Sequence, residues 1–193
     1  MDHSEAESLV RQNIQESIQV KEALLDPMTP LIAKVAQAIS TSISNGGKLI
    51  LFGNGGSAGD AQHIAAELLG RFEAERRAFP AIALTTNTST LTAIGNDYGY
   101  DRIFSRQIEA MADAGDIVIG ISTSGNSPNV IEAIRIAEKN DAVTVGLTGE
   151  KGGLLDAECT YCLKVPSSRT ARIQESHIMI GHILCALIER ELA

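Results

Sequence analysis

The sequence has no apolar run long enough to cross a membrane, and its N-terminus lacks the basic start and apolar core of a secretory signal. Tracts rich in Pro, Ser and Gln, which stay disordered, are also missing. Basic residues are comparatively few: 16 Lys and Arg stand against 24 Asp and Glu, and the net charge of −8 opposes contact with the phosphates of nucleic acid. We therefore expect an ordered, cytoplasmic protein that binds neither membranes nor nucleic acid.

Cysteine is scarce and odd in number, which argues against a disulfide framework. The three residues are Cys159, Cys162 and Cys185. The first two form a C-x-x-C pattern in the apparent strand CTYCLKV, where residues three apart point to opposite faces. We therefore expect reduced, structural thiols and no shared metal or redox site.

A length of 193 residues suits one domain, 1–193, with a single core. Residues 1–46 have apolar positions at helical spacing and predict two helices, joined near Pro27 and Pro30, that pack on the rest of the domain or on a neighbouring subunit. Beyond them come short apolar runs, each followed by small polar residues and a helical pattern: KLILF, AIAL, DIVIGI, AVTVGL and CLKV. This alternation predicts an α/β fold, a three-layer doubly wound parallel sheet with helices at both termini.

The C-terminal helix is expected from about Arg169 to Leu192, with an apolar stripe along one side. Long amphipathic helices at both ends of a chain can pair between subunits, and we expect a homo-oligomer. Ligands of open parallel sheets bind beyond the carboxyl ends of the strands, where strand order reverses. The loops that follow the strands are therefore where a site is expected.

The first of these loops, GNGGSAGD, spans 53–60 between a strand and a helix. Its glycines fit a dinucleotide fingerprint, G-x-G-x-x-A, but the next strand ends in AIALTTN, without the acid that holds a ribose. The pattern G-x-S-x-G around Ser57 also fits a nucleophile elbow, with His182 as a conceivable base. In a third interpretation the loop holds a sugar through the side chain of Asn54 and the backbone of Gly55 and Gly56.

The second loop, GISTSGNSPN, gathers four hydroxyl side chains around one glycine: Ser122, Thr123, Ser124 and Ser127. Pro128 opens the next helix, and Ser127 suits its N-cap. Hydroxyls and free N–H groups at a positive helix end can bind a phosphate dianion without lysine. The competing interpretation is a capped loop with no ligand, which is harder to reconcile with two such loops after neighbouring strands.

Three histidines lie on the predicted helices near these loops. His63 and Glu67 are four residues apart, so they share one helix face and can reach one ligand together. His177 and His182 lie on the last helix with Gln174. A histidine on a helix is more often packed or solvated than catalytic, and we take His177 as structural.

Five blocks follow one another along nearly the whole chain: GNGGSAGDAQHIAAELLGR, IGNDYGYDRIFSRQIEA, GISTSGNSPNVIEAI, LTGEKGG and RIQESHIMIGHIL. Together they resemble the phosphoheptose isomerases of the sugar isomerase (SIS) domain superfamily, which has a flavodoxin-like sheet. The resemblance implies an aldose-ketose isomerase that converts D-sedoheptulose 7-phosphate to D-glycero-D-manno-heptose 7-phosphate through an enediolate. Its product would supply the heptose of lipopolysaccharide or of a related surface glycan.

The resemblance also implies roles for the matching residues and a homotetramer as the assembly. Glu67 and His182 match the acid/base pair. One Zn²⁺ per subunit, without a nucleotide cofactor, is implied at His63, Glu67, Gln174 and His182, which would make Glu67 either base or metal ligand. The implied contacts to the sugar 7-phosphate are Asn54, Gly55, Gly56, Glu67, Arg71, Asn96, Asp97, Ser122, Thr123, Ser124, Ser127 and Gln174.

Some of these roles have alternatives. Gln174 and His182 are eight residues apart, about 12 Å along one helix axis, so a residue from a neighbouring subunit is an alternative ligand. For Asn96 and Asp97 the alternative is an ordinary turn before the glycine that follows. Ala171 departs from the pattern, because some members of the family carry Asp there.

Three other functions compete with the isomerase. A non-catalytic paralogue that associates with a replication initiator shares the blocks AQH, RFEAER and RIQE, but it lacks the Glu67 equivalent and has Asn in place of His182. Retention of both residues favours the enzyme. A sugar-phosphate sensing domain would be attached to a DNA-binding segment, and none is found here. An isomerase of another ketose phosphate fits the same residues.

Overall fold

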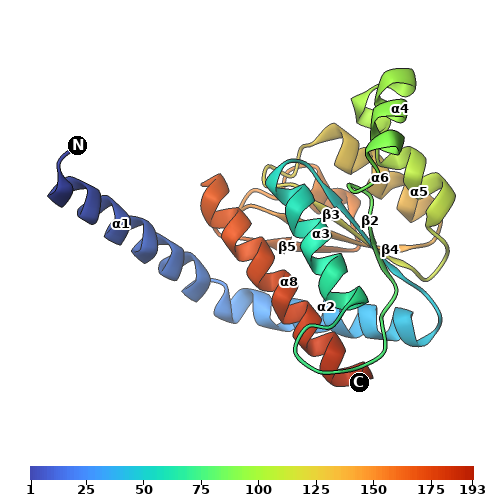
Figure 1. The fold of residues 1–193 in the computed structure, drawn as a ribbon, viewed down its shortest axis with the longest axis horizontal. Helices are drawn as coiled ribbons and strands as arrows, with labels where there is room; N and C mark the ends of the chain where they lie inside the picture. The colour runs from blue at the N-terminus through green and yellow to red at the C-terminus, as the bar shows by residue number, and fades with distance from the viewer.

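The computed structural model describes residues 1–193, and its centre is one sheet of five parallel strands (Figure 1). The strands lie within two residues of the predicted apolar runs: β1 (Leu49–Gly53), β2 (Ala81–Ala83), β3 (Ile117–Ile121), β4 (Val143–Thr148) and β5 (Tyr161–Lys164). β1 and β3 are buried along their whole length. A parallel sheet covered on both faces requires such continuous apolar strands, which is why the sequence shows runs here and no alternation.

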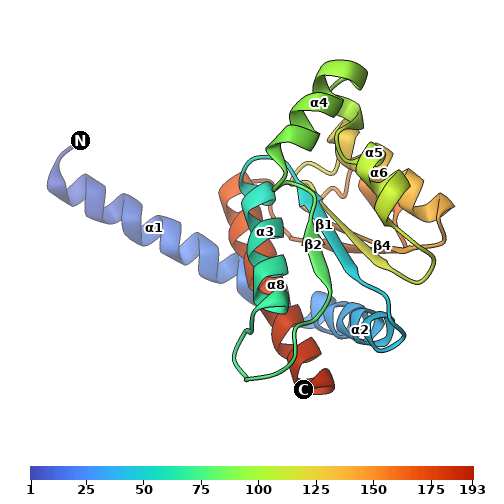
Figure 2. The ribbon, with the colours of Figure 1, turned by 45° about the vertical axis from the view of Figure 1, so that its right-hand side comes forward.

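Helices cover the two faces of the sheet and make three layers. One face packs against α2 (Leu25–Ser44), α3 (Gly56–Leu69) and α8 (Thr170–Leu192). The other packs against α5 (Ser105–Met111), α6 (Pro128–Lys139) and α7 (Leu155–Glu158). α4 (Thr88–Tyr98) and the short η1 (Tyr100–Arg102) stand at the end of the molecule where α3 begins (Figure 2). The predicted fold class, a three-layer doubly wound α/β sheet, is confirmed.

Strand order decides where the loops meet. The order is β2-β1-β3-β4-β5, so the chain leaves β1 toward one edge of the sheet and returns to place β3 on its other side. The register pairs Gly53 with Ile121, the last residues of β1 and β3. Neighbouring parallel strands with diverging connections form the crevice in which doubly wound proteins bind ligands. The two predicted loops therefore begin side by side.

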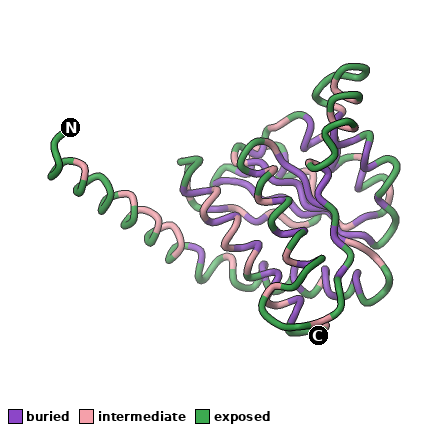
Figure 3. Tube along the Cα trace, viewed as in Figure 1, coloured by how far each residue is buried: buried purple, intermediate pink, exposed green.

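The N-terminal helix α1 (His3–Glu22) projects from the body of the molecule, as the exposed trace in Figure 3 shows. It begins with a capping box between Asp2 and Glu5 and buries none of its residues. Only its second half contacts α8, where Ser17 donates a hydrogen bond to Glu175 over 2.7 Å. Four apolar side chains on it are about half exposed or more: Leu9, Val10, Ile14 and Ile18.

The expected join between the first two helices is wrong in detail. Pro27 and Pro30 do not mark the join between the first two helices, because α2 already begins at Leu25 and includes both. The first N–H groups of a helix have no intrahelical partner, so Pro27 costs nothing there.

None of the helices combines the length and the apolar character needed to cross a membrane.

The cysteines also differ from expectation. Cys159 ends α7 and lies outside the strand that begins at Tyr161, so the alternation of a strand does not apply to it. Cys159 Sγ donates to the carbonyl oxygens of Leu155 and Tyr161, over 2.9 Å and 3.1 Å. Interaction with the Cys162 thiol lowers the pKa of Cys159, and interaction with Cys159 raises the pKa of Cys162. All three cysteines are free.

Candidate active site

The glycine loop after β1 turns sharply into α3. Gly55 is the N-cap of this helix and has φ +58°, a backbone conformation that glycine adopts without strain. Gly56, the first helical residue, lies so close to Gln174 of α8 that a Cβ on it would come within 2.7 Å of Nε2 of that side chain. Glycine at this point therefore lets the start of α3 and the start of α8 approach each other.

The same loop is fastened to the serine loop by a closed pair of amide hydrogen bonds. Asn54 Nδ2 donates to Asn129 Oδ1, and Asn129 Nδ2 donates to Asn54 Oδ1, both over 2.9 Å. Tyr100 of η1 adds a third bond from its hydroxyl to Asn54 Oδ1, over 3.1 Å. Asn129 is buried in the first turn of α6, so it ties Asn54 to the start of that helix. Neither Asn129 nor Tyr100 was expected at the site from the sequence.

The serine loop between β3 and α6 presents clustered hydroxyls. Ser122 Oγ lies 2.9 Å from Ser127 Oγ and 3.5 Å from Ser124 Oγ. Gly125 has φ +67°, and a Cβ there would collide with the backbone of Gly152. Ser127 occupies the N-cap position as predicted, but its side chain makes no capping bond because it pairs with Ser122. Pro128 has no N–H group, and those of Val130 and Ile131 donate to the carbonyl oxygen of Ser127. The clustered hydroxyls and the N–H group of Asn129 are therefore the donors that this helix start offers to an anion.

Glu67 and two histidines meet beside α3. His63 Nε2 lies 3.0 Å from Glu67 Oε1, as their spacing on one helix face predicts. His182 of α8 brings its Nε2 to 3.4 Å from His63 Nε2, with the ring planes 71° apart. The ligand atoms of all three residues lie within 4.8 Å of one another. His182 thus joins two residues that precede it by 115 and 119 positions in one polar cluster.

This donor set could hold a metal ion. Two imidazole nitrogens and one carboxylate oxygen are the ligands that a catalytic zinc site uses, with further positions left for water or substrate. Glu67 and His182 keep partial exposure, and His63 is exposed, so the cluster opens to solvent. The three residues fit zinc by number and type. Gln174, the fourth implied ligand, lies against Gly56 and makes no hydrogen bond to the cluster.

Asp60 is a neighbour of the cluster that sequence reasoning missed. It lies one helical turn before His63 on α3, and its Oδ2 is buried without a hydrogen-bond partner. Burial raises the pKa of Asp60, while the charges of His63 and His182 act in the opposite direction. Spacing could have indicated it, since Asp60, His63 and Glu67 recur at helical intervals.

The other implied contact residues have local partners and no hydrogen bond to the cluster. Asn96 and Asp97 occupy the last turn of α4, where Asn96 Nδ2 donates to Asp97 Oδ1 over 2.8 Å, and neither is hydrogen-bonded to the two loops. Their alternative, an ordinary turn, is wrong because both residues are helical. Arg71 follows α3, is largely exposed, and lies 3.7 Å from Glu75. Tyr100 is the described link between this region and the glycine loop.

The two rival interpretations of the glycine loop find no support in the geometry. Ser57 is buried in the first turn of α3, whereas the serine of a nucleophile elbow must be exposed at the tip of its turn. His182, its conceivable base, is hydrogen-bonded to His63. After β2 the chain continues through two threonines, so no acid is placed to hold a ribose.

Comparison with known proteins agrees with the geometry. The family model described as SIS domain matches residues 12–149. A phosphoheptose isomerase of Aneurinibacillus thermoaerophilus is 54% identical over 185 residues, which cover 95% of this chain and 93% of that protein. The solved structure of a phosphoheptose isomerase from Neisseria gonorrhoeae has a TM-score of 0.91 at 44% identity and covers 96% of this chain and 99% of its own. One from Francisella tularensis has a TM-score of 0.93 at 39% identity, covering 96% and 98%.

Proposed function

The chain belongs to the SIS domain family, and from that membership we propose that it is a phosphosugar isomerase which converts D-sedoheptulose 7-phosphate to D-glycero-D-manno-heptose 7-phosphate. Extensive similarity to phosphoheptose isomerases supports this reaction over the non-catalytic and sensing alternatives. The observation that carries the proposal is the meeting of Glu67 and His182 beside the helix that follows the glycine loop. Isomerisation requires side chains that can accept and donate protons next to the bound sugar, and a carboxylate and an imidazole can do both.

An aldose and a ketose interconvert when a base removes a proton from the carbon next to the carbonyl. We assign this step to the Glu67 carboxylate, which takes the proton from carbon 1 of the ketose. His182 donates a proton to the oxygen on carbon 2 as the enediolate forms, or to the ring oxygen during ring opening. Return of the first proton to carbon 2, while His182 takes a proton from the hydroxyl on carbon 1, gives the aldose. His63, 3.0 Å from Glu67, orients that carboxylate.

The substrate is held at both ends in this proposal. The phosphate accepts hydrogen bonds from the serine loop, whose hydroxyl residues are Ser122, Thr123, Ser124 and Ser127, and from the N–H group of Asn129 at the start of α6. The sugar meets the glycine loop and the start of α8 through Asn54, Gly55, Gly56 and Gln174. Asn96, Asp97 and Arg71 are the further contacts that we propose.

We also propose that zinc binds at His63, Glu67 and His182, one ion per subunit, with Gln174 as a further ligand. The fit of the donor set supports this proposal. When bound, zinc would polarise the carbonyl oxygen of the substrate in place of the proton from His182, and Glu67 would act as base only through a carboxylate oxygen that the metal leaves free. Removal of the metal with a chelator should then lower turnover, and added zinc should restore it.

The remaining proposals concern the protein in the cell. We propose a single domain, 1–193, that assembles as a homotetramer through α1 and acts in the cytoplasm. The exposed apolar side chains of α1 support assembly. The product would enter the synthesis of heptose for lipopolysaccharide or a related surface glycan.

Glu67→Gln and His182→Gln test the reaction directly. Each should lower kcat on sedoheptulose 7-phosphate by at least ~100-fold, because each removes a proton-transfer group. His3→Gln, an exposed histidine on α1, serves as the matched control. Incubation of the purified protein with several ketose phosphates, followed by chromatography of the products, identifies the substrate. Undiminished turnover in either variant, with circular dichroism like that of the parent, would refute the assignment.

A further inference from the structure

A buried ion pair lies behind the candidate site. Arg76 belongs to the loop between α3 and β2, and Glu189 to the end of α8. Their side chains are only 2% and 4% exposed, and Arg76 Nε lies 2.9 Å from Glu189 Oε1. Charged side chains are almost never buried to this extent unless they are paired, because desolvation costs several kcal/mol for each ion. So costly a burial suggests that the pair has a structural or functional role.

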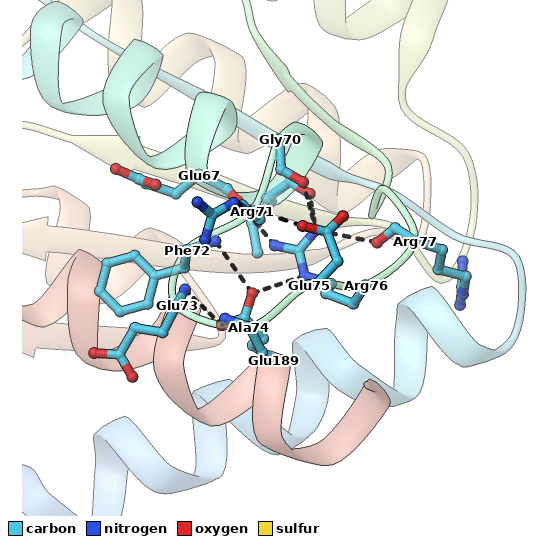
Figure 4. A network of polar contacts seen from close by, with 11 residues as sticks. Glu67, Gly70, Arg71, Phe72, Glu73, Ala74, Glu75, Arg76, Arg77 and Glu189 are labelled. Carbon is cyan, nitrogen blue, oxygen red and sulfur yellow. Dashed lines mark hydrogen bonds and ion pairs between the residues drawn. The ribbon is translucent and has the colours of Figure 1, made fainter.

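Glu189 organises the loop that carries Arg76. Its Oε1 accepts a hydrogen bond from the backbone N–H of Phe72 over 3.1 Å, and its Oε2 accepts from Glu73 over 2.7 Å and from Ala74 over 2.8 Å (Figure 4). Burial alone raises the pKa of Glu189, but these three backbone bonds and the charge of Arg76 together lower it below its ordinary value. The carboxylate is therefore held ionised, with partners for both oxygens.

The other N–H donors of Arg76 cap the C-terminal end of α3. Its Nη1 donates to the carbonyl oxygens of Leu68 and Gly70, over 2.8 Å and 3.0 Å, and its Nη2 donates to that of Glu67 over 2.8 Å. The last carbonyls of a helix have no intrahelical partner and form its negative end. A buried guanidinium satisfies both their hydrogen bonds and their partial charge. One of these carbonyls belongs to Glu67, the residue proposed as base.

The same pair also controls the surroundings of His182. Glu189 lies seven residues after His182, on the same face of α8. Phe72, whose N–H group Glu189 holds, stacks its ring on the imidazole of His182 with centroids 5.5 Å apart and planes 29° apart. Two side chains thus fix the backbone of Glu67 on one helix and the ring that packs on His182 of the other.

We propose that the pair of Arg76 and Glu189 is a positioning device that holds Glu67 and His182 in register across α3 and α8, a role that rests on the isomerase function proposed above. Placement matters because proton transfer is sensitive to displacements of about 1 Å. Groups behind metal ligands likewise set metal affinity, typically by 10- to 100-fold. Neither Arg76 nor Glu189 touches the substrate in this proposal.

Arg76→Lys is the informative variant. Lysine keeps the charge opposite Glu189 but lacks the planar fork that reaches several carbonyls at once. We expect kcat to fall roughly 10- to 100-fold with KM changed less than about 3-fold, and zinc to bind about 10-fold more weakly in competition with a chromogenic chelator. Ile108→Ala, a fully buried residue of α5 on the other face of the sheet, is the destabilised control. It should lower the unfolding temperature while kcat and zinc affinity stay unchanged.

The outcomes separate the two proposals. Arg76→Lys with a lowered unfolding temperature but parental kcat and zinc affinity would overturn the positioning role. A parent protein that leaves sedoheptulose 7-phosphate unchanged would overturn the reaction instead, and the zinc measurement would still decide the role of the pair. If Arg76→Lys does not fold, the Phe72→Leu variant tests the positioning role in its place. That variant keeps the N–H bond to Glu189 but loses the ring on His182, so parental kcat and zinc affinity in it would overturn the positioning role.

Discussion

At the scale of single residues, His177 shows how the fold treats an imidazole outside the candidate site. Its side chain is wholly buried on α8, where Nε2 lies 3.2 Å from the carbonyl oxygen of Thr148 and Nδ1 has no partner. Burial lowers its pKa to about 4, against the opposing effect of the hydrogen bond to Thr148. The folded protein therefore holds this ring neutral at pH 7.

We predict that the free energy of unfolding decreases as the pH is lowered below 6.5, because of His177. The unfolded side chain titrates near 6.5 and the folded one near 4, so the unfolded state binds more protons between these values. The stabilising contribution is complete above pH 6.5, and about 2 kcal/mol of it is lost between pH 7 and pH 5. Urea unfolding at both pH values measures the loss. His177→Gln cannot titrate and should remove that part of the pH dependence; an unchanged slope would contradict the prediction.

At the scale of secondary-structure elements, the approach of α3 and α8 determines how the proposed acid/base pair meets. Gly181, directly before His182, faces Ile64, directly after His63. A Cβ on Gly181 would lie 2.5 Å from Cδ1 and 2.7 Å from Cγ1 of Ile64. Both values are shorter than ordinary van der Waals contacts, so the two helices are as close here as the missing side chain allows.

We predict that Gly181→Val forces α3 and α8 apart, with a cost of roughly 1–3 kcal/mol in stability from overpacking. The displacement should also lower kcat, because Glu67 and His182 lie on the separated helices. Thermal unfolding and kinetics on sedoheptulose 7-phosphate measure the two effects. Gly181→Ala combined with Ile64→Ala restores the space and should recover more activity than Gly181→Val retains. Parental kcat in Gly181→Val would show that the close approach does not matter for the reaction.

At the scale of the whole molecule, α1 is the helix whose apolar side chains are least covered by the rest of the fold. An isolated helix is marginal in water, and most helical stability in proteins comes from packing of an apolar face. Here that face is exposed, with Leu9, Ile14 and Ile18 each about half exposed or more. Val20 near its C-terminal end packs against the core, and further along the helix the contacts to the body are polar, such as those of Arg169 to Glu16 and of Arg172 to the carbonyl oxygen of Asn13. Other copies of the chain are the occupants that we propose for this face.

We predict that Ile14→Glu reduces the assembly to smaller species, because it puts a charge into the apolar face of α1. Light scattering coupled to size-exclusion chromatography measures the molar mass. Gln12→Glu adds the same charge to the same helix, but about 200° around its axis from Ile14, and should leave the mass unchanged. Equal masses for the parent and both variants would exclude α1 as an assembly surface.

The sequence alone determined the alternation of strands and helices, the two loops and the pairing of His63 with Glu67. Each depends on neighbours in the chain, through periodicity, turn chemistry or the spacing of one helix face. Local patterns gave wrong predictions at two element boundaries. Cys159 precedes the strand to which it was assigned, and Pro30 lies within α2 and not between two helices.

Tertiary structure alone decided the strand order, the meeting of His182 with Glu67, the bond between Asn54 and Asn129, and the buried pair of Arg76 with Glu189. These partners are 75 to 119 positions apart or depend on which strands become neighbours. No local spacing encodes them, because side chains from different elements meet only when both elements pack on the same sheet.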